Sequence, residues 1–236
     1  MNASAGNEIT DADALAVPGG RGTLRRALDA AETYIDRATR AVATRVHGAG
    51  KDGLNRHQFA AHALAWTATT GAALEQTLAW AERLEANGQL GESEALIAQA
   101  AFGEYLAQLR AGITLAQGEI ARPTDMGLGP EDVAPLDDPD VFALVTQGNT
   151  IAVRRRIAEL AATGDTGAWG LGDETLDMIR DQFHRFSDER IAPFANDWHR
   201  NNALIPDAVL SALAELGVFG LTVPEAHGGL GLGKIA

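Results

Sequence analysis

Histidine and carboxylate side chains form two candidate metal-ligand pairs, and neither spacing completes a site. His57 and His62 lie five residues apart, which places them about 140° apart around a helix. They cannot both ligate one ion from one helix face, as an i, i+4 pair could, so surface or capping roles are expected for these histidines. Asp181 and His184 have the i, i+3 spacing of di-iron bundles, which need that motif twice together with further glutamates. We therefore predict no metal-ligating residue.

The glycine-rich run at residues 228–233 is the candidate for holding a nucleotide phosphate. It follows VFGLTV, which has the composition of a strand. Its glycines do not fit the GxGxxG spacing, no helix follows, and no Lys-Ser/Thr pair of a P-loop is present. We interpret the run as a turn in which glycine permits positive φ.

Composition excludes several classes of function. The chain has 19 Lys and Arg against 32 Asp and Glu, a net charge of -13, which disfavours nucleic acid as a partner. The short cluster Arg154–Arg156 does not reverse that balance. Without cysteine there is no disulfide and no thiolate chemistry. No apolar run is long enough to span a membrane, and the N-terminus lacks the pattern of a secretory signal, so we expect a soluble, cytoplasmic protein.

Residues 23–162 are predicted to form a helical domain after a flexible lead-in at residues 1–22. Apolar residues recur at helical spacing from Leu24 to Val46, from Asn55 to Ala86, and from Glu92 to Arg122, where Pro123 ends the pattern. Three long helices with short turns predict an antiparallel bundle, with Gly103, Gly112 and Gly118 as points of close helix packing. Two short helices are expected between Val141 and Leu160, and both Trp66 and Trp80 are expected in the core.

Residues 163–172, TGDTGAWGLG, have the composition of a linker between two domains, and Trp169 is a candidate for anchoring it to a neighbouring surface. Asp173 is then the expected N-cap of a helix that buries Leu176, Ile179, Phe183 and Phe186. Pro193 is expected to kink or break this helix. Pro206 begins the next one, with Leu210, Leu213 and Leu216 facing inward.

The motifs in residues 173–236 resemble the opening of an acyl-CoA dehydrogenase. They read FxxFxxERIAPFAxxWHR from Phe183 to Arg200, IPxxVLxxLAELGVFGLTVPE from Ile205 to Glu225, and GGLGL from Gly228 to Leu232. Ala226-His227 departs from the acidic or aromatic pair usual in the family. The fold class implied is all-α: an antiparallel helical bundle followed by an incomplete N-terminal helical domain of that family, residues 173–236. The extension before it resembles that of members acting on a branched, carboxylated acyl-CoA.

The resemblance implies an FAD-dependent enzyme that desaturates an acyl-CoA substrate and passes electrons to an electron-transfer flavoprotein, as a homo-oligomer. In the family a glutamate removes the α-proton, and the β-hydride passes to the flavin. Both the flavin domain and this base would follow Ala236, so no catalytic or cofactor-binding residue is assigned, and FAD is not expected to bind this chain alone. Glu225 matches a loop position of the family rather than the base.

A second interpretation stays open at this point. The chain could be a non-catalytic helical module for interaction or oligomerisation that keeps the helices of the family without its chemistry. In an intact enzyme of the family, the extension is expected to be a packing module that covers part of the enzyme or extends the dimer interface.

Overall fold

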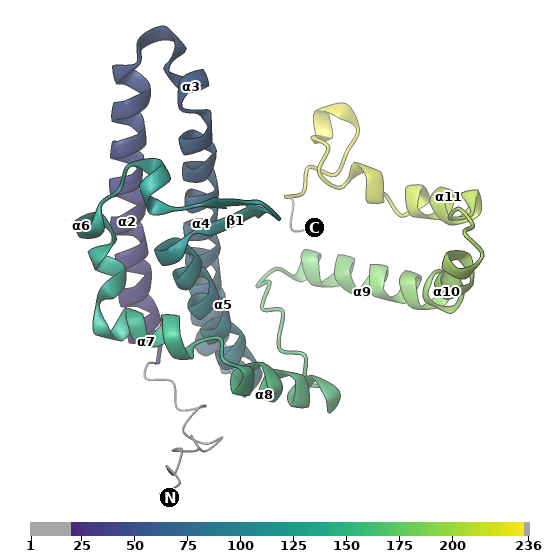
Figure 1. Ribbon diagram of the computed structural model, residues 1–236. Helices are drawn as coiled ribbons and strands as arrows, with labels where there is room; N and C mark the ends of the chain where they lie inside the picture. Colours follow the sequence, from purple (N-terminus) through teal and green to yellow (C-terminus); the bar gives the residue numbers. More distant parts are fainter. Residues whose placement is uncertain (1–19, 234–236) are drawn as a thin grey trace, which may run out of the picture. The chain divides into compact units, whose positions relative to one another are not determined.

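The computed structural model describes residues 20–233 and divides into two compact units, Met1–Gly170 and Leu171–Ala236 (Figure 1). The predicted lead-in lies largely outside the described residues, and the first helix begins at Arg21. The predicted all-α class is confirmed, because the only strands among the described residues form one short hairpin.

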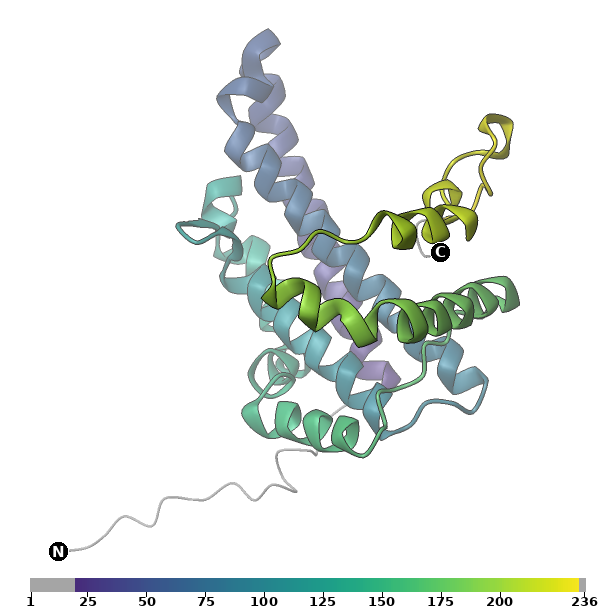
Figure 2. The ribbon, with the colours of Figure 1, turned by 90° about the vertical axis from the view of Figure 1, so that its right-hand side faces the viewer.

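The first unit is built on three long helices, α2 (Arg21–Gly48), α4 (Gln58–Ala86) and α5 (Glu92–Ala111). Figures 1 and 2 both show α2 and α4 side by side and antiparallel, with α5 packed on α4. The remaining elements of the unit are η1 (Gly50–Asp52), α3 (Gly53–Arg56), β1 (Ile113–Ala116), β2 (Glu119–Ala121), η2 (Pro123–Met126), α6 (Pro130–Val133), η3 (Ala134–Asp137), α7 (Pro139–Gln147) and α8 (Ile151–Ala162).

A closed apolar core joins these helices. The predicted stripe of α2 is buried at Leu24, Leu28, Ala31, Ala38 and Val42, while Ile35 and Val46 are partly buried at its edge. The α4 helix has neighbours on several sides, because α2, α5, β1 and η2 all pack against it. That arrangement agrees with the apolar residues that its sequence places on two faces.

The predicted third helix is wrong beyond Ala111. Gly112 follows α5 with φ +137°, outside the helical region, and the chain then forms an antiparallel hairpin with Ile113 opposite Ala121. Ile113 and Ala121 are buried while Ile120 is 38% exposed, which is the alternation of a strand pair. The prediction of a helix failed because a short apolar run fits the period of a helix and that of a strand equally well. The β-branched residues and the Gln117-Gly118 turn favour the hairpin.

The glycines predicted as close-packing points therefore separate into two kinds. A Cβ on Gly103 would lie 2.8 Å from the Cα of Gly148, so α5 and the end of α7 approach closely there, as predicted. Gly112 ends a helix and Gly118 lies in the hairpin turn. In the second predicted helix a break at His57 separates α3 from α4.

The second unit contains α9 (Glu174–Arg190), α10 (Ala192–Arg200), α11 (Asp207–Glu215), η4 (Val218–Gly220) and η5 (Glu225–His227). Asp173 caps α9 as predicted, since its carboxylate accepts from the backbone N–H groups of Thr175 (2.8 Å) and Leu176 (3.3 Å). The helix breaks at Ile191, two residues before Pro193. The VFGLTV segment is not a strand, because Val218–Gly220 forms a 3-10 turn.

Burial in the second unit is shallower than its sequence predicts. No residue of α9 is fully buried, although Leu176, Ile179, Phe183 and Phe186 lie half-buried on the predicted face. Leu210 was expected to face inward and is 41% exposed, whereas its neighbour Val209 is buried. Leu213 and Leu216 are half-buried as predicted, and Val209 lies four residues before Leu213, so it shares their helix face.

Candidate functional site

The glycine-rich loop folds back on the segment just before it. The N–H groups of Leu230, Gly231 and Leu232 donate to the carbonyls of Gly220 (2.9 Å), Val223 (2.8 Å) and Leu221 (2.8 Å), respectively. In the same loop, the N–H groups of residues 228 and 229 donate to carbonyls within residues 224–225. The N–H groups of residues 228–232 are thus all bonded to backbone carbonyls and are not free to bind a phosphate.

Glycine is required in this loop for conformational reasons. Gly228 and Gly231 have φ values of +81° and +64°, as the turn interpretation predicts. A Cβ on Gly229 would lie 2.1 Å from the carbonyl oxygen of Val223, which is closer than a side-chain carbon can approach. The loop is therefore a tight turn. Glu225, the carboxylate nearest to it, is exposed at the start of η5.

The candidate metal pairs do not assemble. His62 instead accepts a hydrogen bond at Nε2 from the indole Nε1 of Trp66 (3.2 Å), one helical turn away. Asp181 accepts from Arg180, its neighbour in sequence (2.7 Å). Among residues 20–233 no group of three His, Cys, Asp or Glu side chains is placed to hold a metal ion.

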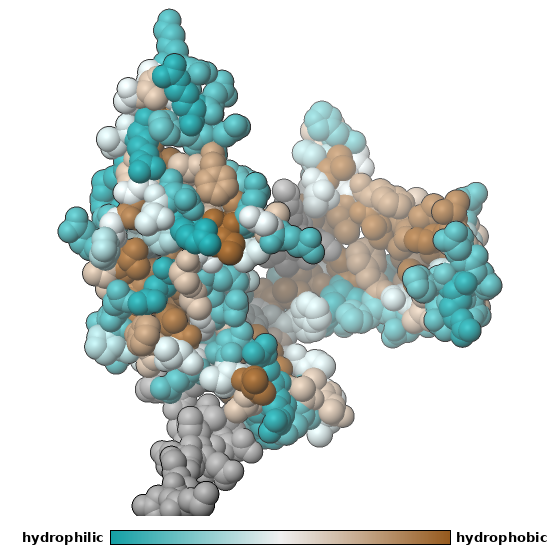
Figure 3. Space-filling view, viewed as in Figure 1, coloured by the Kyte–Doolittle hydropathy of each residue, from teal (hydrophilic) through white to brown (hydrophobic). Residues whose placement is uncertain are grey.

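The second unit displays large apolar side chains to solvent, and we call these residues the open apolar surface. They range from 41% to 91% exposed and comprise Met178, Phe194, Leu204, Ile205, Leu210, Phe219 and Leu230. Figure 3 shows brown apolar surface over the helices of this unit. Clustered exposure of this kind marks a surface that another protein surface covers.

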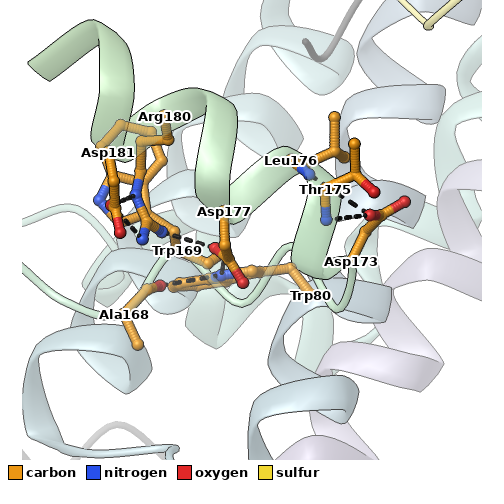
Figure 4. A network of polar contacts seen from close by, with 9 residues as sticks. All are labelled: Trp80, Ala168, Trp169, Asp173, Thr175, Leu176, Asp177, Arg180 and Asp181. Carbon is orange, nitrogen blue, oxygen red and sulfur yellow. Dashed lines mark hydrogen bonds and ion pairs between the residues drawn. The ribbon is translucent and has the colours of Figure 1, made fainter.

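The segment before the second unit is held against the first unit, and we call residues 165–170 the strap. The indole Nε1 of Trp80 donates to the carbonyls of Ala168 (3.2 Å) and Trp169 (2.9 Å), as Figure 4 shows. Arg83 donates to the carbonyl of Gly170 (3.3 Å). The strap is thus fixed by backbone carbonyls that a tryptophan from α4 recognises.

A buried carboxylate holds the strap from the other side. Glu94, only 6% exposed, accepts from the backbone N–H of Ala168 (2.6 Å) with one oxygen and from that of Gly91 (2.9 Å) with the other. Ser93 donates to the carboxylate of Asp165 (2.7 Å). The N-terminal end of α5 therefore fixes the strap while it caps its own helix.

The tryptophan predictions hold for one residue and are wrong for another. Trp66 is 42% exposed rather than part of the core. Trp80 is half-buried and packs against the core, and its polar edge holds the strap. Trp169 was expected to anchor the linker; its carbonyl accepts a bond from Trp80, while its side chain is 62% exposed. The strap contacts could not be read from spacing, because backbone carbonyls leave no pattern in a sequence.

Comparison with known proteins agrees with the motifs. Residues 173–236 match the family model described as acyl-CoA dehydrogenase, N-terminal domain. The chain is also 49% identical over 217 residues to (2S)-methylsuccinyl-CoA dehydrogenase of Cereibacter sphaeroides, a match that covers 88% of this chain. The chain belongs to the acyl-CoA dehydrogenase family.

Two other relatives match a shorter part of this sequence. Benzylmalonyl-CoA dehydrogenase of Aromatoleum aromaticum is 54% identical over 54 residues, 23% of this chain, and glutaryl-CoA dehydrogenase of Desulfococcus multivorans is 33% identical over 57 residues, 24% of this chain. The chain spans 38% of the length of the methylsuccinyl-CoA relative, and 14% and 15% of the lengths of the other two.

The glycine-rich loop does not fit a flavin pyrophosphate, since the N–H groups of residues 228–232 are already bonded to carbonyls. None of the helices in residues 20–233 is both long enough and apolar enough to cross a membrane.

Proposed function

We propose that this chain is the N-terminal portion of an FAD-dependent acyl-CoA dehydrogenase that oxidises (2S)-methylsuccinyl-CoA to mesaconyl-CoA in the ethylmalonyl-CoA pathway. One observation carries the proposal. A match of 217 residues to the methylsuccinyl-CoA relative extends far outside residues 173–236 and through most of the first unit. The relatives with other acyl groups in their names match only 54 and 57 residues.

The reaction removes one hydrogen from the α-carbon and one from the β-carbon of the thioester and leaves a double bond between them. Bound FAD would supply the hydride acceptor, and an electron-transfer flavoprotein would take the electrons onward. We assign the flavin-binding domain and the glutamate base to parts of such an enzyme that this chain does not span, so the chain alone is expected to be inactive. A homo-oligomer acting in the cytoplasm belongs to the same proposal.

The contribution of this chain is structural under this proposal. Residues 23–162 form the helical extension, residues 163–172 the linker, and residues 173–236 part of the family's N-terminal domain. The open apolar surface supports this division, because its side chains would pack against the remainder of the enzyme. The strap supports an ordered end to the extension, since Trp80 and Glu94 fix it within the first unit.

A chimeric enzyme tests the proposal. This chain would replace the matching region of the Cereibacter sphaeroides relative, and oxidation of methylsuccinyl-CoA would be followed with an artificial electron acceptor. We expect the chimera to bind FAD and to oxidise methylsuccinyl-CoA in preference to glutaryl-CoA. This chain alone and the remainder of the relative alone serve as controls, and both should be inactive.

The alternative function, a non-catalytic interaction module, predicts a different outcome. The chimera would fold without holding FAD or oxidising any of these thioesters, because its segments would not complete the enzyme. Turnover by this chain alone would contradict both proposals.

A further inference from the structure

The first unit carries a basic groove on the outer side of α2, distinct from the glycine-rich loop and the open apolar surface of the second unit. The groove has a volume of about 610 Å³. Its walls come from one face of α2 and from the segment that crosses it between η2 and α6. The lining residues are Arg37, Arg40, Ala41, Thr44, Arg45, Gly127 and Asp132. Three guanidinium groups and one carboxylate line it, in a chain whose net charge is -13.

Backbone carbonyls hold two of the arginines in place. Arg37 donates from Nη1 to the carbonyls of Glu131 (2.5 Å) and Asp132 (3.4 Å), and Arg45 donates from Nη1 to the carbonyl of Asp125 (3.0 Å). These bonds use only part of the donor set, because a guanidinium has five N–H groups. The positive charge of each also stays unpaired, since a carbonyl carries no formal charge.

Gly127 leaves room for the guanidinium group of Arg45 at the groove. A Cβ at this position would be 2.4 Å from Cζ of Arg45, so any larger residue would displace the guanidinium. Gly127 also has φ +87°, where glycine is favoured. The guanidinium is therefore positioned before any ligand arrives, which lowers the entropy lost on binding.

The third arginine is not used by the fold. Within residues 20–233 the side chain of Arg40 makes no hydrogen bond and no ion pair, and it is exposed at the groove. Asp132 offsets one of the three positive charges of the groove, and its Oδ2 accepts from the backbone N–H of Gly129 (2.9 Å). Asp36, one turn before Arg40, is an exposed carboxylate on the same helix but is not part of the groove lining.

We infer that the basic groove binds the diphosphate group of a small organic phosphate. Guanidinium groups bind phosphate through paired, charge-assisted hydrogen bonds, and three of them against one carboxylate leave the lining positively charged, as binding of an anionic diphosphate requires. The net charge of -13 repels an extended polyanion such as nucleic acid, so a small ligand that fits within the groove is favoured. The volume is that of a small-molecule site.

Calorimetric titration of the 236-residue chain with inorganic pyrophosphate at low ionic strength tests the inference. We expect saturable binding of one pyrophosphate per chain. Arg40→Gln should weaken it about fivefold or more, the loss of one charge-assisted contact. Arg40→Lys keeps the charge and loses the planar guanidinium, so its affinity for pyrophosphate should lie between those of the unchanged chain and Arg40→Gln.

Arg155→Gln is the matched control, because Arg155 is also an exposed helical arginine without a partner among the described residues. It removes the same charge outside the groove and should change the affinity by less than about twofold. Equal weakening by Arg40→Gln and Arg155→Gln, or the absence of saturable binding, would overturn the inference.

Titrations with ADP and adenosine then separate the sources of the phosphate. Tighter binding of ADP than of pyrophosphate assigns the groove to a nucleoside diphosphate, whereas equal binding assigns it to the diphosphate alone. Adenosine should not bind. If it bound as tightly as ADP, the arginines would not be the recognition element, and the inference would fail.

Discussion

The two units of the chain form helices equally well but bury their apolar faces very differently. In the first unit Tyr34, Leu74 and Phe102 expose 1% or less of their surface. In the second unit α9 and α10 contain no fully buried residue, and Phe219 is 64% exposed. Sequence patterns that specify helices therefore do not guarantee a closed core in the same segment.

The difference follows from what each helix packs against. Helices of ordinary length depend on the burial of an apolar face for most of their stability in water. The α4 helix has neighbours on several sides, whereas α9 packs within its own unit mainly on α10. The second unit therefore keeps local determinants, such as the Asp173 cap, and needs a covering surface for the rest of its stability.

The largest expected contrast is in amide hydrogen exchange. Core amides of α2 and α4 should exchange only through global unfolding, while those of α9 and α10 should exchange through local opening. The opening free energies should differ by about 3 kcal/mol or more, which is over a hundredfold in exchange rate. Equal protection of the two units in the isolated chain would show that the second unit is closed after all.

Removal of a phenylalanine side chain should give an effect that depends on the unit. Phe102→Ala leaves a cavity in the first unit and should lower the free energy of unfolding by about 3–5 kcal/mol. Phe219→Ala removes the same atoms from a mostly exposed side chain and should change it by less than about 1 kcal/mol. Urea denaturation followed by circular dichroism measures both, and comparable losses would remove the distinction between the units.

A methyl group added between α5 and α7 should lower the free energy of unfolding by less than Phe102→Ala does. In Gly103→Ala the new Cβ meets the backbone of Gly148, so the variant should lose about 1–3 kcal/mol through overpacking. Gly48→Ala, where nothing lies within 4 Å, is the matched control and should be neutral or slightly stabilising. A neutral Gly103→Ala in the same denaturation assay would mean that the two backbones can move apart.

The sequence predicts much of this fold because helix patterns and caps act locally. The ends of α2, the break between α7 and α8, and the Asp173 cap follow from nearby residues. The hairpin after Ala111 was missed, since its apolar spacing fits a helix as well and only Gly112 and the Gln117-Gly118 turn indicate otherwise. Trp66 was predicted in the core because it lies on an apolar helical stripe. Spacing cannot show whether another element covers that stripe, and Trp66 is exposed.

Functional residues were harder to predict than elements. The resemblance of residues 173–236 could be read from motifs, since the loop with Glu225 and the glycines is nearly continuous in sequence. The basic groove combines arginines of α2 with Gly127, a residue some 80 positions further along the chain, and only the folded chain brings them together. The strap depends on carbonyl groups that every residue possesses, so no residue type marks it.

Loss of the Trp80 indole donor should loosen the strap without opening the core. Trp80→Phe keeps most of the ring and removes the hydrogen bonds to the carbonyls of Ala168 and Trp169, a loss of about 1 kcal/mol. Exchange of the Ala168 amide, which is bonded to Glu94, should then become about fivefold faster. Trp66→Phe, which removes only a bond to exposed His62, should leave that rate unchanged. Unaltered exchange in Trp80→Phe would show that the contacts of Glu94, Ser93 and Arg83 hold the strap without the indole.

The smallest expected effect is a pH-dependent contribution of Glu104. Hydrogen bonds from Gln108 and Asn149 lower the pKa of its carboxyl below the ordinary value of 4.5. The unfolded chain therefore binds a proton at higher pH than the folded chain, so the charged group stabilises the fold at neutral pH, and this contribution disappears as pH falls through the lowered pKa. Glu104→Gln cannot ionise, so at pH 7 its melting temperature should be lower than that of the parent chain, by less than about 2 °C. At a pH below the folded pKa of Glu104, the two melting temperatures should be equal. A difference in melting temperature that persists unchanged at low pH would assign the effect to the shape of the side chain rather than to its charge.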